Sequence, residues 1–153
     1  MDEPTSAPDA LTELILEVFR VNGRLIAAGD ELVAPLGLTS ARWQVLGAIA
    51  LAAEPTTVAG LARSMGLTRQ SVQRIINELA SDQVVRLVDN PQHRRAKRVV
   101  FTSRGEALVG EASKRQAPWA RALSEHFEPS LIAKSTACLR ALRERLDADP
   151  SAR

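Results

Sequence analysis

Residue types suited to hold nucleic acid gather on one short segment of the chain. Arginine can donate two hydrogen bonds to a guanine edge, and glutamine can pair in the same way with adenine, in the DNA major groove. Backbone amides and hydroxyl groups at the start of a helix favour a phosphate. The segment after Gly66 offers these groups together: Thr68, Arg69, Gln70, Ser71, Gln73 and Arg74. We therefore expect a DNA-reading helix here, although such a polar face on an isolated helix is more often only solvated.

A second basic segment follows, in a loop between two runs rich in β-branched residues. The runs at 84–88 and 97–102 predict the two strands of a hairpin. Arg94 and Arg95 lie at the tip of its loop, and Lys97 begins the second strand. Such a wing can place an arginine in the minor groove, where a narrow A·T-rich stretch concentrates negative potential. The alternative is a solvated basic loop.

The two short helices before the hairpin have the residue spacing of a tight helical pair. Ala62 is small where the second helix crosses the first, Gly66 supplies the positive φ of the turn, and Val72 locks the second helix onto the core. The N-caps Thr57 and Thr68 predict helices over 58–65 and from 68 to about 81. Many helical pairs share this pattern, so the basic hairpin is what favours nucleic-acid recognition.

Longer amphipathic helices flank this pair. Apolar spacing predicts one helix over 11–35, and another over 39–53 begins at the N-cap Thr39. A capping box, Ser103-Arg104-Gly105-Glu106, predicts a helix over 103–127. A last helix after Pro129 carries an apolar seam suited to pack against another helix. The sequence thus predicts a mainly α fold with a small β-hairpin wing, of the α+β class.

The charge of the chain is concentrated in its middle. The 153 residues carry a net charge of only +2, but residues 36–105 carry ten Lys or Arg against four acids, whereas residues 1–35 are acidic. A basic block between other helices is typical of a polyanion-binding module. A single cysteine, an N-terminus without signal-peptide features and short apolar runs favour a cytoplasmic protein that does not enter the membrane.

The sequence resembles the MarR family of bacterial winged-helix regulators. The stretches 38–46, 58–79, 89–97 and 87–108 carry the resemblance, and their order and spacing agree with the family. The resemblance implies a winged helix-turn-helix flanked by N- and C-terminal dimerisation helices. It further implies a homodimer with recognition helices in successive major grooves and wings in the minor groove. Repression relieved by a small molecule or oxidant is implied as well.

The expected division follows from this resemblance. Residues 1–35 form part of the dimerisation region, 36–103 the DNA-binding lobe and 104–153 the C-terminal dimerisation helices. The expected partners are a second copy of the chain, an effector of unknown identity, and double-stranded DNA with a pseudo-palindromic operator whose half-sites lie about one helical turn apart. The expected DNA contacts are Ser40, Arg42, Thr68, Arg69, Gln70, Ser71, Gln73, Arg74, Arg94, Arg95 and Lys97.

The wing departs from the family's pattern at one position. The family usually carries Asp-x-Arg, in which the Asp braces an Arg that enters the minor groove, whereas this chain has His93-Arg94-Arg95. Arg95 aligns with the family's Arg, but its acidic brace is missing. Either Asp89 substitutes from the end of the strand or the wing is looser, and both alternatives stay open.

Other reactive residue types show no arrangement for catalysis or metal binding. His93 and His126 lie in different predicted elements without companions at metal-ligand spacing. No nucleophile motif, glycine-rich phosphate loop or carboxylate pair is present, so we expect no enzyme, no cofactor and no metal. Cys138 falls on the apolar seam of the last helix, which favours a buried structural thiol over a redox switch. Trp43 and Trp119 fit core packing better than an effector pocket.

Two other functions compete with that of a regulator. A winged-helix module can bury its recognition helix against another protein, but such a face is rich in Leu or Phe, and this one offers Arg and Gln. An enzyme or a small-molecule carrier with an incidental helix-turn-helix is supported only by the possible pocket at Trp43 and Trp119, which has no assigned ligand. We therefore expect a sequence-specific double-stranded DNA-binding transcriptional regulator, acting as an effector-responsive homodimeric repressor.

Overall fold

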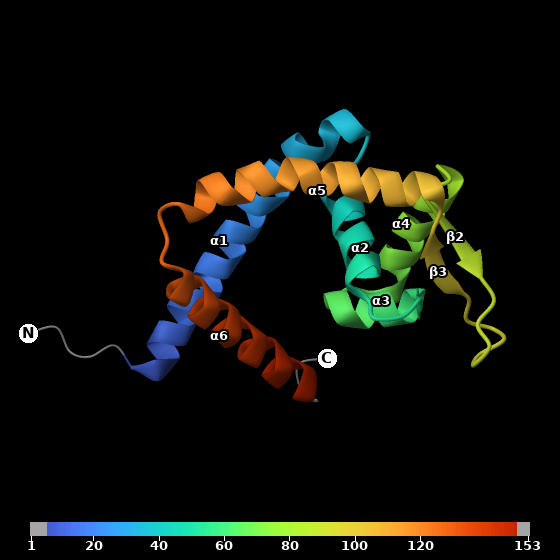
Figure 1. Cartoon of the computed structure of the whole chain (residues 1–153). Helices are drawn as coiled ribbons and strands as arrows, with labels where there is room; N and C mark the ends of the chain where they lie inside the picture. Colours follow the sequence, from blue (N-terminus) through green and yellow to red (C-terminus); the bar gives the residue numbers. More distant parts are fainter. Residues whose placement is uncertain (1–5, 150–153) are drawn as a thin grey trace, which may run out of the picture. The chain divides into compact units, whose positions relative to one another are not determined.

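The computed structural model describes residues 6–149 (Figure 1), which form helices and one small sheet. The elements, in chain order, are α1 (Ala7–Val33), a 3-10 turn η1 (Ala34–Leu36), α2 (Ser40–Leu51), β1 (Thr56–Thr57), α3 (Val58–Met65), α4 (Arg69–Ser81), β2 (Val85–Val88), β3 (Arg98–Phe101), α5 (Ser103–Ser124) and α6 (Pro129–Ala148). The chain forms two compact units, one up to Arg115 and one from Gln116 onward. The mainly α fold with a hairpin wing is confirmed. The expected functional division at 35 and 103 stays a prediction.

Three threonine caps set the start of the central helices, as the sequence predicts. The side-chain oxygens of Thr39, Thr57 and Thr68 each accept a hydrogen bond from the backbone amide three residues later, at 3.2, 3.1 and 3.1 Å. Each cap satisfies an amide that has no partner within its own helix. Gly66 ends α3 with φ 64°, the left-handed conformation that glycine adopts without strain. The predicted turn between α3 and α4 is thereby confirmed.

The predicted capping box of α5 is wrong by one residue. The backbone amide of Gly105 donates to the Thr102 side chain at 3.1 Å, so Thr102 caps the helix in place of Ser103. The Thr102 hydroxyl also donates to the Gln83 carbonyl at 2.6 Å. This long-range bond fixes the cap, and sequence spacing alone does not reveal it.

The sheet has one strand more than the predicted hairpin. β3 lies between β1 and β2 and pairs antiparallel with both. In the short pairing with β1, Thr56 faces Val99 and Thr57 faces Arg98. β1 escaped prediction because it has only two residues and no alternating pattern. It ties the start of α3 to the base of the wing.

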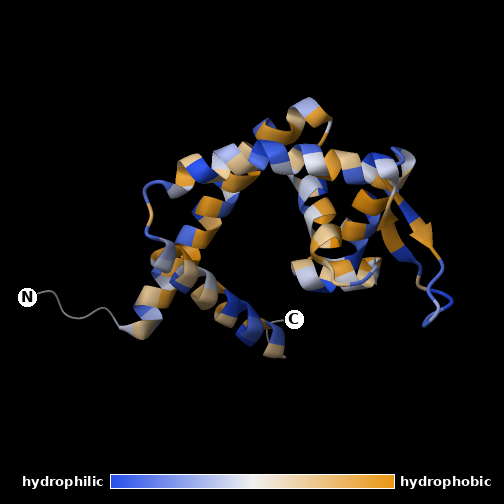
Figure 2. Cartoon of the chain, viewed as in Figure 1, coloured by the Kyte–Doolittle hydropathy of each residue, from blue (hydrophilic) through white to orange (hydrophobic). Residues whose placement is uncertain are grey.

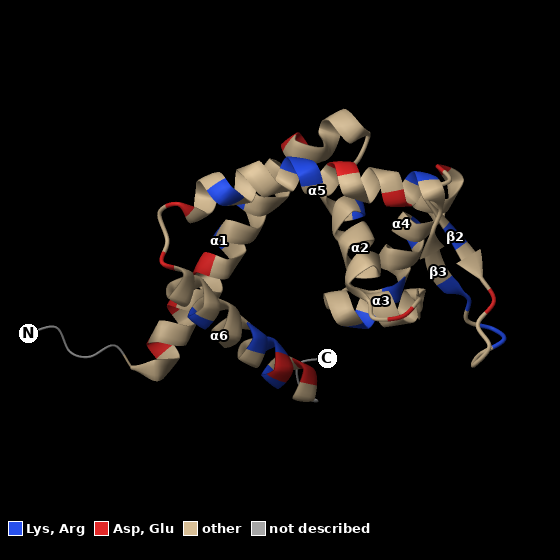
Figure 3. Cartoon of the chain, in the orientation of Figure 1, with Lys and Arg blue, Asp and Glu red and all other residues tan. Residues whose placement is uncertain are grey.

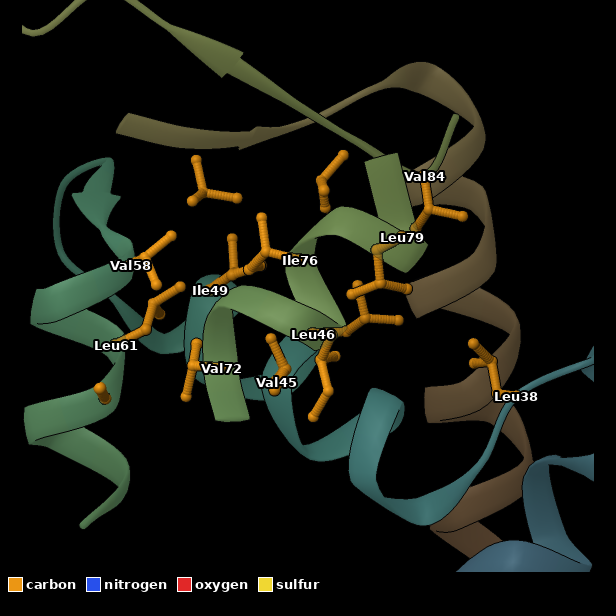
Figure 4. Packing of buried hydrophobic residues seen from close by; sticks show 14 of the residues in the cluster. Leu38, Val45, Leu46, Ile49, Val58, Leu61, Val72, Ile76, Leu79 and Val84 are labelled. Carbon is orange, nitrogen blue, oxygen red and sulfur yellow. The ribbon is translucent and has the colours of Figure 1, made fainter. Parts of the chain in front are cut away.

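A single apolar core holds α2, α3, α4 and the sheet together. Figure 4 shows side chains of α2, α3 and α4 meeting in this core. The largest fully buried side chains are Leu46, Leu61, Ile76, Leu79, Val33, Val45, Val72, Val85 and Val99. We call this region, from α2 to β3, the lobe. Its core explains the predicted roles of Ala62 and Val72, which are 4% and 0% exposed.

The long helices α1 and α6 differ from the lobe, because their apolar residues are mostly exposed within the single chain. Figure 2 shows hydrophobic residues along both helices. Only Gly29 and Val33 are buried on α1, and α6 has no buried residue. The large exposed apolar residues are Leu11, Leu16, Val18, Phe19, Val21, Leu25 and Ile26 on α1, and Leu131, Ile132, Leu139 and Leu146 on α6.

Cys138 lies on α6 and is exposed in the single chain. The prediction of a buried thiol is wrong for the isolated chain, because α6 has no buried residue in the described part of the chain. In the described part of the chain, no helix has the length and apolarity needed to cross a membrane. Nor do three or more His, Cys, Asp or Glu side chains gather within residues 6–149 as they would around a metal ion.

Candidate nucleic-acid interface

The second helix of the turn, α4, has one buried and one exposed face. Val72, Ile75, Ile76 and Leu79 are buried in the core. The opposite face carries the predicted DNA contacts: Thr68, Arg69, Gln70, Ser71 and Arg74 are exposed and Gln73 is half-buried. The 3.6-residue period of the helix separates these two sets. The structure therefore brings six of the predicted site residues together on one surface.

Some of these side chains already have partners along the helix. Arg74 forms an ion pair with Glu78 at 2.8 Å, and the Gln73 amide donates to Asn77 at 2.9 Å. The hydroxyl groups of Thr68 and Ser71 lie 2.7 Å apart at the first turn. Arg69 forms no ion pair within residues 6–149, so its guanidinium is available to a ligand.

The wing loop is shaped by a residue that the sequence analysis did not single out. Asn90 is 7% exposed, and its side-chain oxygen accepts from the Gln92 amide at 3.1 Å. Its backbone carbonyl accepts from the His93 amide at 3.2 Å, and a second turn joins the Ala96 amide to the His93 carbonyl at 3.1 Å. The Asn-Pro pair was the available signal, because Asn before Pro favours the start of a turn.

The basic side chains of the wing are free of acidic partners in the described part of the chain. Arg94, Arg95 and Lys97 are exposed, and none of them forms an ion pair with Asp89 or another described carboxylate. Figure 3 shows the basic residues in the loop between β2 and β3. The turn around Asn90 thus shapes the loop that carries Arg95, and Asp89 forms no ion pair with Arg95 in the described part of the chain.

A surface hollow joins the wing to the recognition helix. It has a volume of about 250 Å³ and is lined by Thr57, Val58, Ala59, Arg69, Gln73, Leu87, Arg95, Ala96 and Lys97. Three of these residues are cationic and none is acidic, so the hollow favours an anion. The two predicted basic segments, which lie apart in sequence, therefore form one surface. We call it the cationic surface, and it consists of Thr68, Arg69, Gln70, Ser71, Gln73, Arg74, Arg94, Arg95 and Lys97.

Ser40 and Arg42 do not belong to the cationic surface. Ser40 is 3% exposed, and its backbone amide donates to Asp30 at 2.6 Å. The Arg42 side chain is 17% exposed and forms ion pairs with Asp82 and Glu78. Both were predicted as DNA contacts, but the fold places Ser40 in a contact with α1 and Arg42 in a contact with the end of α4.

The resolved pKa shifts lie outside this surface. On α5, the hydrogen bond and charge of Lys114 lower the pKa of the exposed Glu111, and Glu111 in turn raises the pKa of Lys114. Their ion pair measures 2.7 Å.

The folded elements and their order define a winged helix-turn-helix protein. Residues 36–96 match the model of the MarR family. Uncharacterized protein Rv2011c of Mycobacterium tuberculosis is 31% identical over 141 residues, covering 92% of this chain and 97% of the relative. The chain belongs to the MarR family, and it is a DNA-binding transcription regulator.

Solved structures of the family share the fold. CouR from Rhodococcus jostii RHA1, solved bound to p-coumaroyl-CoA, has a TM-score of 0.76 at 23% identity, covering 84% of this chain and 90% of CouR. A mutant of MarR from E. coli, solved in complex with operator DNA, has a TM-score of 0.75 at 21% identity, covering 90% of this chain and 98% of MarR. At these identities the likeness concerns the fold.

Proposed function

We propose that this chain is a homodimeric repressor that binds a pseudo-palindromic operator through the cationic surface and releases it when a small molecule binds. The observation that carries the proposal is the hollow between α4 and the wing, where Arg69, Arg95 and Lys97 converge without an acidic residue. A duplex is a dense line of phosphates, and cations without protein partners gain most from contact with it. No catalytic step belongs to this function.

Within the surface, position suggests a role for each predicted contact. Arg69, Gln70, Gln73 and Arg74 project from the outer face of α4, where bidentate pairing with bases gives specificity. Thr68 and Ser71 stand at the helix start, where hydroxyl and amide groups suit a phosphate. The wing residues Arg94, Arg95 and Lys97 serve the adjacent minor groove. The mutant of E. coli MarR that was solved in complex with operator DNA supports DNA binding by this chain in general.

The exposed apolar residues of α1 and α6 support a homodimer. Phe19 is 69% exposed and Leu131 is 55% exposed in the single chain, and neither helix carries enough buried residues to be held by its own fold. A row of large exposed apolar side chains along a helix is typical of a protein interface. A second copy of the chain presents the same helices, so it can bury both sets.

The effector response rests on the relative that was solved with a ligand. CouR was solved with p-coumaroyl-CoA bound, which supports small-molecule control of this chain as well. A thermal-shift screen of aromatic acids and their thioesters should find a compound that raises the melting temperature, because a ligand that binds only the folded state stabilises it. The same compound should weaken DNA binding.

Salt dependence tests the DNA function. We would select an operator from a random duplex library and measure its affinity by fluorescence anisotropy between about 50 and 200 mM salt. With about six to ten phosphate contacts, affinity should fall by roughly 10³- to 10⁵-fold over that range. Undetectable or salt-insensitive binding would refute the proposal.

Substitution of Arg69 tests whether the cationic surface is responsible for DNA binding. Arg69→Ala removes a proposed base contact, so it should weaken operator binding by about tenfold and relax the preference for the operator over an unrelated duplex. Lys114→Ala on α5 is the matched control, because it removes an exposed cation outside the surface. Equal losses in both variants would mean that only net charge matters, contrary to the proposal.

A further inference from the structure

Arg42 links the start of α2 to the end of the recognition helix. Its guanidinium forms an ion pair with Asp82, and its Nε lies 3.8 Å from a carboxylate oxygen of Glu78. A third contact, at 3.5 Å, joins Arg42 to the backbone carbonyl of Gly37. The side chain is only 17% exposed, whereas the acids of most described ion pairs are about half exposed. Arg42 is thus held inside the lobe, away from solvent.

The first turn of α2 is itself anchored to α1. The Ser40 amide donates to Asp30 of α1 at 2.6 Å, and the two helices cross so closely that a Cβ on Gly29 would lie 2.8 Å from the Ser40 hydroxyl oxygen. Arg42 stands two residues further along the same turn. A continuous set of contacts therefore runs from α1, through the start of α2, to the end of α4.

Asp82 and Glu78 lie at the end of α4 that is remote from Arg69. Asp82 is the C-cap of the helix, and Glu78 lies one turn before it. Acidic groups near a helix C-terminus are unfavourable, because that end carries partial negative charge. Their presence is explained by Arg42, which supplies the compensating positive charge from α2. The ion pair with Arg42 therefore holds the end of α4 to the start of α2, in addition to the apolar contacts of the helix.

Glu78 connects this attachment to the DNA-facing surface. One of its carboxylate oxygens faces Arg42, while the other pairs with Arg74 at 2.8 Å. Arg74 belongs to the cationic surface and is 69% exposed. Glu78 therefore lies between two arginines, in charge contact with Arg42 at 3.8 Å and hydrogen-bonded to Arg74 of the cationic surface.

We propose that Arg42, through Asp82 and Glu78, is a positioning residue that sets the orientation of α4 and hence operator specificity, without touching DNA. This inference rests on the proposed DNA function. Apolar contacts are non-directional and tolerate small shifts of the helix, whereas the charged hydrogen bond from one guanidinium nitrogen of Arg42 to Asp82 has a preferred direction. α4 is about 20 Å long, so a rotation of about 10° at its attached end moves the reading end by roughly 3 Å. Base-edge hydrogen bonds do not survive such a shift.

The test compares an operator selected by the wild-type protein with a scrambled duplex of equal length. The informative variants are Arg42→Met, which keeps an apolar stem but no charge, and Asp82→Asn. If only net charge mattered, the two variants would change DNA affinity in opposite directions. Losing the Arg42 charge would weaken binding to both duplexes, and losing the Asp82 charge would strengthen it. If Arg42 positions α4, both variants should change specificity in the same direction. The ratio of operator affinity to scrambled-duplex affinity should fall by about three- to tenfold in each.

Further variants separate positioning from stability and from direct contact. The double variant should lose no more specificity than Arg42→Met alone, because both changes remove one attachment. The salt slope should match that of the wild type, since no phosphate contact is lost. General destabilisation would lower binding of both duplexes equally and leave the ratio unchanged. The control is Glu54→Gln, because Glu54 is exposed and forms no ion pair in the described residues.

The outcomes distinguish this inference from the DNA function. A wild-type chain that fails to bind the selected duplex overturns the proposed function and the inference with it. Normal wild-type binding, with an unchanged affinity ratio in Asp82→Asn, overturns the inference alone. Asp82 is half exposed, so that variant should remain folded even where Arg42→Met does not. A salt slope reduced by about one in Arg42→Met would instead make Arg42 a direct phosphate contact.

Discussion

The lobe and the long helices place similar apolar side chains in opposite environments. In the lobe, Leu46, Ile76 and Leu79 are completely buried by the same chain. On α1 and α6, Phe19 and Leu131 are more than half exposed, although the helices are longer. Burial of an apolar side chain contributes about 1.5 to 3 kcal/mol. The lobe therefore obtains its stability from its own core, while the long helices need a second surface to obtain theirs.

The largest effect should follow from a cavity in the lobe. Leu79→Ala removes a fully buried side chain from α4 and should cost about 2 to 5 kcal/mol in the free energy of unfolding. Urea unfolding at fixed protein concentration measures this loss. Leu51→Ala is the control, because Leu51 is 88% exposed and its truncation should change stability by less than about 0.5 kcal/mol. Equal costs would mean that the core assignment is wrong.

A charge on α1 should act on assembly more than on folding. Phe19→Asp should raise the dimer dissociation constant by about tenfold or more, because a charge buried at an interface loses its hydration. Sedimentation velocity over a concentration series measures this constant. Leu51→Asp introduces the same charge on an exposed residue of the lobe and should leave assembly unchanged. A wild-type chain that stays monomeric at micromolar concentration would contradict the expected role of the long helices.

A smaller effect should come from the turn that shapes the wing. Asn90→Ala removes the side-chain oxygen that accepts from the Gln92 amide, and should cost about 1 kcal/mol. Operator affinity should fall as the loop carrying Arg95 loosens. Faster amide exchange at Gln92 and His93 would locate the change in the wing. Gln92→Ala is the control, and a loss as large as that of Asn90→Ala would show that the Asn90 side chain is not the brace.

The smallest effect concerns the exposed ion pair on α5. The pKa of Glu111 should lie below its ordinary value and return toward it in Lys114→Ala, as measured by carboxyl NMR titration. Because the folded-state pKa is lowered, the pair's contribution is present above the ordinary pKa and is lost as the pH falls through the lowered one. Added salt should shrink the shift, because both groups are exposed. A Glu111 pKa unaffected by Lys114→Ala would contradict the pairing.

Local rules explain why much of the lobe could be predicted from the sequence. Caps such as Thr57 and Thr68 act within three residues, and the Gly66 turn needs only its own backbone freedom. The alternation of buried and exposed residues on α4 follows from helical periodicity. These features depend on neighbours in sequence, so the sequence displays them directly.

The features that escaped prediction depend on distant contacts. Arg42 looked like a DNA contact because its partner Asp82 lies 40 residues away and nothing in the spacing pairs them. The cap at Thr102 depends on the Gln83 carbonyl, and the shape of the wing depends on burial of Asn90. The exposure of Cys138 depends on the tertiary surroundings of α6, which the apolar spacing of that helix does not reveal.

The pairing of β1 with β3 couples the base of the wing to the start of α3. Thr57 pairs with Arg98 at the base of the wing and also caps α3 through its side chain. Opening of the wing base therefore removes a strand partner from the residue that starts α3. Amides of the wing base and of the first turn of α3 should exchange with solvent hydrogen at the same rate, as one cooperative unit. The wing tip, beyond Asn90, should exchange independently and faster.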